Sequence, residues 1–159
     1  MNLNLLIPMA GKGSRFKEAK YETFKPFIKI NQNNMYEYVT NKFPKEVKIW
    51  VITCKEYLKS EHINDLKKKN INILYISPHK LGPAYTIWCC KNHLPLNESF
   101  FISYCDIDWS WNFSQIKKYL FNDGIVFTNK GFHPHKLINN YSAFCRTKKN
   151  QLIKIKEKE

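Results

Sequence analysis

The chain has 159 residues, of which 43% are hydrophobic and 15% aromatic, and its formal net charge is +13. This size and composition favour one globular domain with its own core, spanning residues 1–159. No apolar run is long enough to cross a bilayer, and the N-terminus lacks the basic and apolar regions of a secretory signal. We therefore expect a cytoplasmic protein without a membrane partner.

The positive charge by itself is compatible with nucleic-acid binding. Lysine, asparagine, isoleucine, tyrosine and phenylalanine are all abundant, however, and arginine occurs only at Arg15 and Arg146. A dedicated binder of phosphate backbones would use more arginine, so nucleic acid is not a favoured partner. The positive field is still expected to attract phosphorylated small molecules.

The five cysteines are odd in number and include no C-x-x-C pair. This pattern is typical of reduced, mostly buried thiols and argues against a disulfide framework, a zinc site or a catalytic thiol.

Apolar runs predict five strands, at residues 3–8, 47–53, 71–76, 99–104 and 124–128. Helical periodicity predicts helices at residues 35–43, 55–69, 82–94 and 113–121. Residues 17–23 are polar and predict an irregular, mobile flap, while 24–30 predict a short extended piece. Residues 141–147 and 152–156 predict a hairpin joined by a polar turn.

This alternation of strands and helices predicts an α/β fold of the Rossmann-like, three-layer kind, with a mainly parallel sheet and a C-terminal β-hairpin. Ligands of such sheets lie beyond the carboxyl ends of the strands. A glycine-rich turn follows the first strand, and Asp106 and Asp108 follow the fourth. We therefore expect both features to face one cleft.

The glycine-rich turn lies within the stretch from Met9 to Phe16. Gly11 and Gly13 let the backbone approach a bulky group and leave amide N–H groups outward, which suits a triphosphate beside Arg15. The alternative, a tight exit from a strand, is about equally compatible with the turn alone.

Asp106 and Asp108 offer hard oxygen ligands, which suit Mg²⁺ together with phosphate oxygens and water. The alternative is an ordinary acidic loop that caps the next helix. A phosphate-binding loop in the same cleft favours the metal hypothesis.

Two further segments are candidates on chemistry alone. Gly82, Pro83 and Ala84 open a helix, where backbone can approach a base or an anion, although simple punctuation explains them equally well. His133 and His135 flank a proline and could bind an acceptor phosphate or move a proton, or be merely solvated. No third ligand at zinc spacing accompanies them.

Several of these segments together resemble nucleotidyltransferases of the sugar-phosphate pyrophosphorylase type. Residues 9–16, Met-Ala-Gly-Lys-Gly-Ser-Arg-Phe, resemble that family's glycine-rich signature, and 24–27, Phe-Lys-Pro-Phe, resemble its lysine motif. Residues 82–84 resemble its base-proximal loop, 104–108 its metal-binding aspartate motif, and 157–158 its later Glu-Lys pair. These five motifs keep the family's order over nearly the whole chain.

The resemblance implies a transferase that moves a nucleoside monophosphate from an NTP to a phosphorylated acceptor and releases pyrophosphate. It assigns catalytic roles to Arg15 and Lys25, the latter otherwise one surface lysine among many. It assigns Mg²⁺ binding to Asp106 with Asp108 as helper. It assigns nucleotide binding to Met9, Ala10, Gly11, Gly13, Ser14, Gly82, Pro83 and Ala84.

Residues 7–11, 106–109 and 131–135 look most like the branch that builds bacterial capsules, which includes choline-phosphate and phosphoglutamine cytidylyltransferases. That branch implies CTP or another pyrimidine NTP, and it allows a homo-oligomer. Residues 31–34 depart from the family's N-G-K-P turn, so the chain must reverse there in another way. The family usually continues beyond the Glu-Lys pair, so we also expect a C-terminally truncated member. A non-catalytic nucleotide-binding remnant and a basic RNA-binding domain stay open as alternatives.

Overall fold

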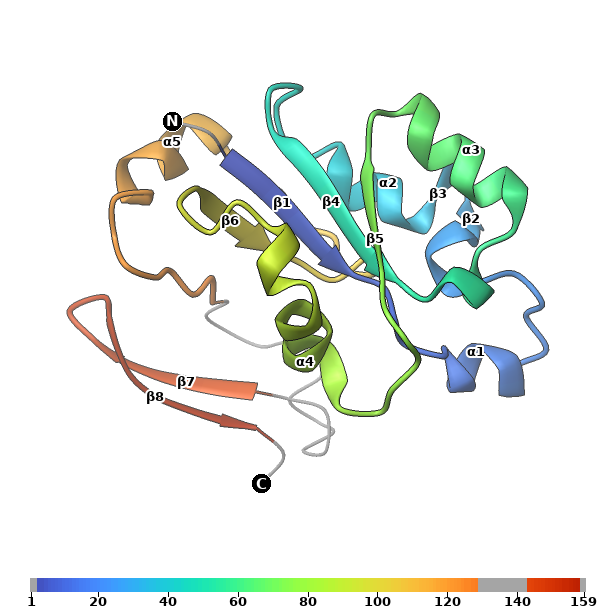
Figure 1. Ribbon diagram of the computed structural model, residues 1–159. Helices are drawn as coiled ribbons and strands as arrows, with labels where there is room; N and C mark the ends of the chain where they lie inside the picture. The colour runs from blue at the N-terminus through green and yellow to red at the C-terminus, as the bar shows by residue number, and fades with distance from the viewer. Residues whose placement is uncertain (1–2, 129–142, 158–159) are drawn as a thin grey trace. The chain divides into compact units, whose positions relative to one another are not determined.

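The computed structural model of the protein describes residues 3–128 and 143–157 (Figure 1). The chain forms two compact units, residues 1–117 and 118–159. The larger unit contains a four-stranded sheet made of β1 (Leu3–Pro8), β4 (Lys48–Thr53), β5 (Asn72–Tyr75) and β6 (Ser99–Ile102). Its α-helices are α1 (Ser14–Glu18), α2 (Met35–Thr40), α3 (Ser60–Lys68), α4 (Gly82–Cys89) and α5 (Phe113–Ile116).

The four strands pair in the order β5-β4-β1-β6, and every pair is parallel. The chain moves from β1 outward to β4 and β5, then returns to place β6 on the other side of β1. The carboxyl ends of β1 and β6 therefore flank the point where the strand order reverses, which is where open α/β sheets bind ligands. The predicted mainly parallel α/β sheet is confirmed.

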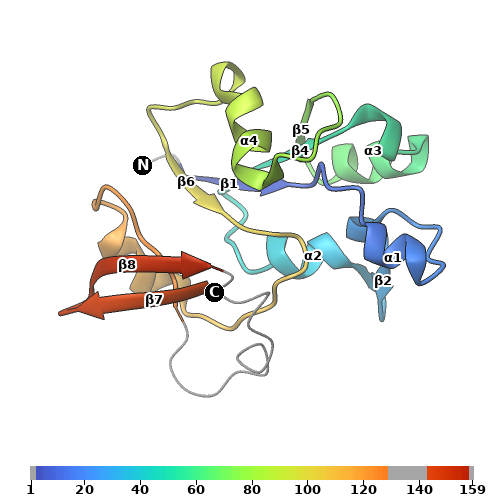
Figure 2. The same ribbon diagram turned by 90° about the horizontal axis from the view of Figure 1, so that it is seen from below.

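Strand β1 lies in the interior of the sheet, between β4 and β6, and its apolar side chains are covered on both faces. Leu5, Leu6 and Ile7 are almost completely buried. Leu6 packs with Ile52 and with residues that follow α4. Helices α4 and α2 lie on opposite sides of the sheet (Figure 2). Burial on both faces explains why the strand is a continuous apolar run rather than an alternating one.

A buried amide fixes the register of β1 against both neighbours. The Asn4 side chain, fully buried, donates to Glu98 Oε2 at 2.8 Å and accepts from Trp50 Nε1 at 2.9 Å. These bonds join the segment before β6 to β1 and β4. A slip of one residue would leave these polar groups unpaired, which is costly, so the network fixes the register of β1 against β4 and β6.

The helices are shorter than predicted. The segment predicted as one helix at 55–69 begins with the 3₁₀ turn η2 (Lys55–Tyr57), and Leu58 is extended before α3 starts at Ser60. Likewise η3 (Lys91–His93) follows α4, and η4 (Lys117–Tyr119) follows α5. Periodicity spans these breaks because a 3₁₀ turn has nearly the helical period.

Two predictions for the segment after the glycine turn were only partly correct. Part of the predicted irregular flap belongs to α1, and the predicted extended piece contains the 3₁₀ turn η1 (Lys25–Phe27). A short ladder, β2 (Lys29–Ile30) with β3 (Asn33–Asn34), follows it. Asn31 makes the reversal by adopting a φ of 54°, a left-handed conformation that asparagine tolerates, and so replaces the expected turn.

In the smaller unit, β7 (Ala143–Lys148) and β8 (Gln151–Glu157) form the predicted hairpin. Lys149 and Asn150 both have positive φ, as a two-residue hairpin turn of type I′ requires. The predicted strand at 124–128 is wrong: these residues have no regular structure, and Val126 and Phe127 are half exposed. An apolar run becomes a strand only where a neighbour pairs with it, and no described strand does so here. No helix in the described ranges is long and apolar enough to span a bilayer.

Candidate functional site

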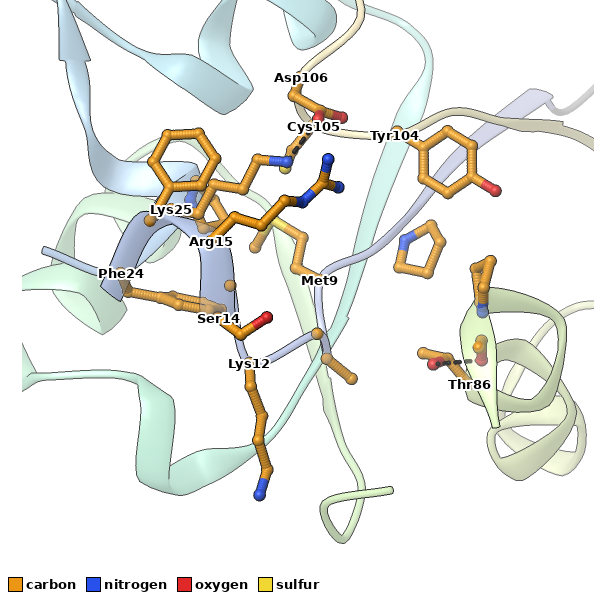
Figure 3. A pocket seen from close by; sticks show the side chains of 18 of the residues that line it. Met9, Lys12, Ser14, Arg15, Phe24, Lys25, Thr86, Tyr104, Cys105 and Asp106 are labelled. Carbon is orange, nitrogen blue, oxygen red and sulfur yellow. Dashed lines mark hydrogen bonds and ion pairs between the residues drawn. The ribbon is translucent and has the colours of Figure 1, made fainter. Parts of the chain in front are cut away.

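A cavity of about 740 Å³ opens at the carboxyl ends of β1 and β6 in the larger unit. Its wall is built from four segments: residues 8–16, residues 24–26, the start of α4 with the loop before it, and residues 104–106. The expected meeting of the glycine turn with the loop after the fourth strand is therefore found. The side chains that face one another across it are drawn in Figure 3.

The first segment leaves β1 in a fixed direction. The Met9 N–H donates to Ile52 O at 2.7 Å, and Thr53 Oγ1 donates to Met9 O at 3.2 Å. Met9 and Ala10 are each 3% exposed. Both backbone groups of Met9 are thus held by β4, so the glycine turn begins from a rigid base.

The two glycines of the turn have different reasons to be glycine. Gly13 has a φ of +62°, which residues with side chains rarely adopt, whereas Gly11, two residues earlier, has no such requirement. A Cβ placed on Gly11 would meet no heavy atom of the described residues within 4 Å. Gly13 is therefore needed by the turn itself, whereas the space beside Gly11 belongs to the cavity.

The 3₁₀ turn η1 carries Lys25 into the cavity. Pro26 is the second residue of this turn, and the ring of Phe27 stacks on His62 with centroids 4.0 Å apart and an interplanar angle of 15°. Phe27 and His62 are 5% and 6% exposed, so the turn rests on a packed base. The Nδ1 atom of His62 accepts the Lys59 N–H at 3.2 Å, as the unprotonated nitrogen of a neutral imidazole does. Burial, which lowers the pKa of His62, acts in the same direction.

The ammonium group of Lys25 forms an ion pair with Asp106, and its Nζ lies 5.1 Å from the centroid of the Phe16 ring. The side chains of Arg15 and Lys25 extend toward Asp106, while that of Lys12 extends the other way (Figure 3). The lining contains Lys12, Arg15, Lys25 and Lys80 but only one carboxylate, that of Asp106. The cavity is therefore suited to an anion.

The two aspartates of the D-x-D motif are separated by the structure. Asp106 lines the cavity, with its side chain 37% exposed. Asp108 lies outside the lining, is 65% exposed and pairs with Lys42 Nζ at 2.7 Å. This hydrogen bond from Lys42 lowers the pKa of Asp108. The turn at residues 105–106 breaks the alternation that would place both carboxylates on one side.

The chemistry of this wall fits one Mg²⁺ shared with a phosphate ligand. Among the described residues, no group of three or more His, Cys, Asp or Glu side chains could hold a metal ion. Mg²⁺ is commonly bound by one or two carboxylates together with substrate phosphates, which Asp106 could satisfy. Cys105 is unsuited as a ligand or nucleophile because burial raises its thiol pKa to about 11.

The wall opposite the glycine turn comes from the start of α4. Gly82 and Pro83 line the cavity, but Ala84 is exposed outside the lining. His79 and Thr86 also line it, and sequence reasoning missed both. Their signal was the placement of a histidine and a threonine on either side of the Gly82-Pro83 pair, which carries little weight by itself.

The remaining predicted positions are placed as follows. Gly11, Gly13 and Ser14 line the cavity with Met9 and Ala10. His133 and His135 lie outside the described residues, as does Lys158 of the Glu-Lys motif.

Comparison with known proteins gives the fold but no close relative. No family model matches the sequence, and no curated protein matches it. Among solved structures, a nucleoside-diphosphate-sugar pyrophosphorylase from Vibrio cholerae superposes with a TM-score of 0.71 at 19% identity. An inositol-1-phosphate CTP transferase from T. maritima gives 0.67 at 18%, and a UTP-bound UGPase from Acinetobacter baumannii gives 0.65 at 16%.

This protein has the fold of nucleotidyltransferases. The matches cover 98%, 98% and 100% of this chain and 67%, 63% and 68% of the other three chains, so the chain spans about two thirds of their length. The family resemblance is thus confirmed at the level of the fold. The narrower capsule-type branch stays a prediction.

Proposed function

We propose that the chain binds a nucleoside triphosphate and transfers its nucleoside monophosphate to a phosphorylated acceptor. An oxygen of the acceptor phosphate forms a bond to the α-phosphorus of the NTP. The bond from that phosphorus to the α,β-bridging oxygen breaks, and both of its electrons leave with pyrophosphate. The products are a nucleoside-diphosphate-linked compound and pyrophosphate.

The observation that carries this proposal is the composition of the cavity at the β1–β6 switch point. Residues 8–16 offer glycine backbone and Arg15, residues 24–26 offer Lys25, and residues 104–106 offer a single carboxylate, Asp106. The gap beside Gly11 leaves room for a group to approach the backbone closely. An anion that carries a metal ion satisfies all three of these segments, and the fold is that of proteins named as pyrophosphorylases or as a CTP transferase.

In this proposal the chain works by positioning and by neutralising charge, as phosphoryl transfer generally requires. Backbone amides of Gly11, Gly13 and Ser14 would hold the triphosphate. Arg15 would neutralise charge that develops on pyrophosphate. Lys25 would hold the α-phosphate or the acceptor phosphate, which requires it to exchange its present contact with Asp106 for a phosphate oxygen.

Asp106 would be the protein ligand of Mg²⁺. The ion, when bound with the triphosphate, would supply positive charge to phosphate oxygens. The exposed position of Asp108 and its pairing with Lys42 give it a weaker claim to this role than Asp106.

Backbone at Met9, Ala10, Gly82 and Pro83 would border the base and ribose. The sequence resemblance favours CTP or another pyrimidine NTP, a sugar phosphate or small capsule-precursor phosphate as acceptor, and a role in surface polysaccharide synthesis in the cytoplasm. These narrower assignments, and a homo-oligomeric state, belong to the proposal.

A pyrophosphate-release screen tests the proposal. The protein is incubated with Mg²⁺, each of the common NTPs and a panel of phosphorylated acceptors. We expect release with at least one pair, abolished by Asp106→Asn and retained by the matched variant Asp108→Asn. Binding of Mg·NTP without release in any pair would favour a nucleotide-binding module instead. Absence of both binding and release would refute the proposal.

A further inference from the structure

The loop between β5 and α4 is closed by a chain of three hydrogen bonds centred on His79. The Leu81 N–H donates to His79 Nδ1 at 3.1 Å. His79 Nε2 lies 3.0 Å from Thr86 Oγ1. Thr86 Oγ1 donates to Gly82 O at 3.2 Å, which is the dashed line at Thr86 in Figure 3. The three bonds run from the loop across to the second turn of the helix and back to its first residue.

The direction of every bond in this chain follows from the first one. Because Nδ1 accepts the Leu81 N–H, the neutral imidazole carries its proton on Nε2. Nε2 therefore donates to Thr86 Oγ1, and the threonine hydroxyl is left to donate to the Gly82 carbonyl. Thr86 is 3% exposed, so its hydroxyl depends on these two partners for its hydrogen bonds.

The residues enclosed by this chain have the most constrained backbone of that wall. Gly82 adopts a φ of +83°, and Pro83 follows it in the first turn of α4. A Cβ at Gly82 would meet no heavy atom of the described residues within 4 Å, so packing does not hold this turn from the cavity side. Leu81 occupies the N-cap position of α4, and its apolar side chain makes no capping hydrogen bond to the first turn of the helix.

His79, Gly82, Pro83 and Thr86 all line the cavity. We propose that His79 and Thr86 are positioning residues that lock the Gly82–Pro83 turn in the conformation that contacts the nucleoside portion of the NTP. This inference rests on the proposed function. It adds that recognition of the nucleoside depends on a side-chain hydrogen-bond chain on the wall away from the phosphate-binding turn.

The proposed role of His79 and Thr86 predicts a difference between two ligands that a purely structural role would not produce. In the proposed function, the triphosphate is held by the glycine turn and by Arg15 and Lys25. Inorganic tripolyphosphate carries the same kind of charge but no nucleoside. Loosening the lock should therefore weaken binding of Mg·NTP and leave binding of Mg·tripolyphosphate unchanged.

The test uses isothermal titration calorimetry of the full chain with Mg·CTP, Mg·UTP, Mg·ATP, Mg·GTP and Mg·tripolyphosphate. Thr86→Val removes the hydroxyl at nearly constant shape, and His79→Phe removes both imidazole nitrogens. For the NTP that binds the wild-type protein most tightly, we expect each variant to lose about three- to tenfold in affinity, the range of one or two hydrogen bonds. We expect no change for tripolyphosphate. The double variant should lose little more than one single variant, because the bonds form one chain.

Thr40→Val is the matched control. Thr40 is a buried threonine whose Oγ1 donates to the Glu37 carbonyl at 3.3 Å in α2, away from the cavity. It should change stability as Thr86→Val does and change neither affinity. Thr86→Ser, which keeps the hydroxyl, should restore NTP binding and serves if Thr86→Val does not fold.

The outcomes separate the two proposals. If the wild-type protein binds an NTP more tightly than tripolyphosphate and the lock variants keep that preference, the inference is overturned and the proposed function stands. Equal losses for NTP and tripolyphosphate also overturn it, since they indicate general damage to the site. If the wild-type protein binds no NTP, the proposed function fails and the inference fails with it.

Discussion

One loop of this protein carries two aspartates that each pair with a lysine, and the two pairs differ in their surroundings. Asp106 pairs with Lys25 inside the cavity, and Asp108, two residues later, pairs with Lys42 outside it. The outer pair is more exposed at its aspartate, at 65% against 37%. The comparison teaches that two chemically identical ion pairs carry different information: the outer pair is an ordinary surface contact, and the inner pair lies in a cavity that Lys12, Arg15 and Lys80 also line.

The largest expected effect separates the two lysines. Lys25→Ala should lower turnover by about 10²- to 10³-fold, because it removes a fixed charge from the transferring phosphate in the proposed mechanism. Lys42→Ala should leave turnover within about twofold and the free energy of unfolding nearly unchanged, as for an exposed pair. Steady-state pyrophosphate release and urea unfolding of both variants measure this. Equal activity of the two variants would remove the distinction between the pairs.

The next prediction applies the same contrast to the two glycines of the turn. Gly13→Ala should destabilise the protein by about 1–2 kcal/mol, because alanine is strained at a φ of +62°. Gly11→Ala should leave the free energy of unfolding nearly unchanged, since its Cβ meets no described atom, yet weaken Mg·NTP binding. Chemical denaturation and calorimetry are read side by side on both variants. The prediction fails if Gly11→Ala binds Mg·NTP as tightly as the wild-type protein.

A smaller effect concerns His62, which packs against the turn η1 that carries Lys25. Burial lowers the pKa of His62 from its ordinary 6.5, with a further lowering by Lys59 and opposing contributions from Glu61 and Asp65. The unfolded chain therefore binds a proton near pH 6.5 that the folded chain does not bind until lower pH. Stability is complete above pH 6.5 and falls as the pH drops below it.

Replacing His62 by glutamine removes that titration. We expect the slope of unfolding free energy against pH, between pH 6.5 and 5, to be shallower in His62→Gln than in the wild-type protein. His93→Gln, at a histidine on the turn η3, is the matched control for the effect of a histidine-to-glutamine substitution itself. Identical slopes for the wild-type and His62→Gln proteins would contradict the assignment of a buried neutral imidazole.

Much of the sheet and half of the site could be predicted because they depend on local patterns. The apolar run of β1 with glycines directly after it predicts a strand followed by a close-approach turn, and strand ends in βαβ units meet at one edge. Asp106 and the Gly82–Pro83 pair follow from the same rule.

The rest depends on contacts that the sequence does not display. Asp108 lies outside the cavity and pairs with Lys42, which follows the end of α2, and the spacing of the D-x-D motif gives no sign of this. Thr86 meets His79 only because Gly82 turns the backbone between them. The apolar residues at 124–128 have a strand-like composition but no described strand to pair with.

The parallel sheet also has a consequence for how the protein folds. Its central strand is made first, but Leu3 pairs with Ser99, and Lys25 contacts Asp106 across 81 positions of sequence. Contacts of such long sequence separation form slowly, because a long loop must close before they stabilise anything. The anion-binding cavity cannot assemble in stages along the chain. During synthesis, Lys25 waits for its partner until β6 has left the ribosome and docked beside β1.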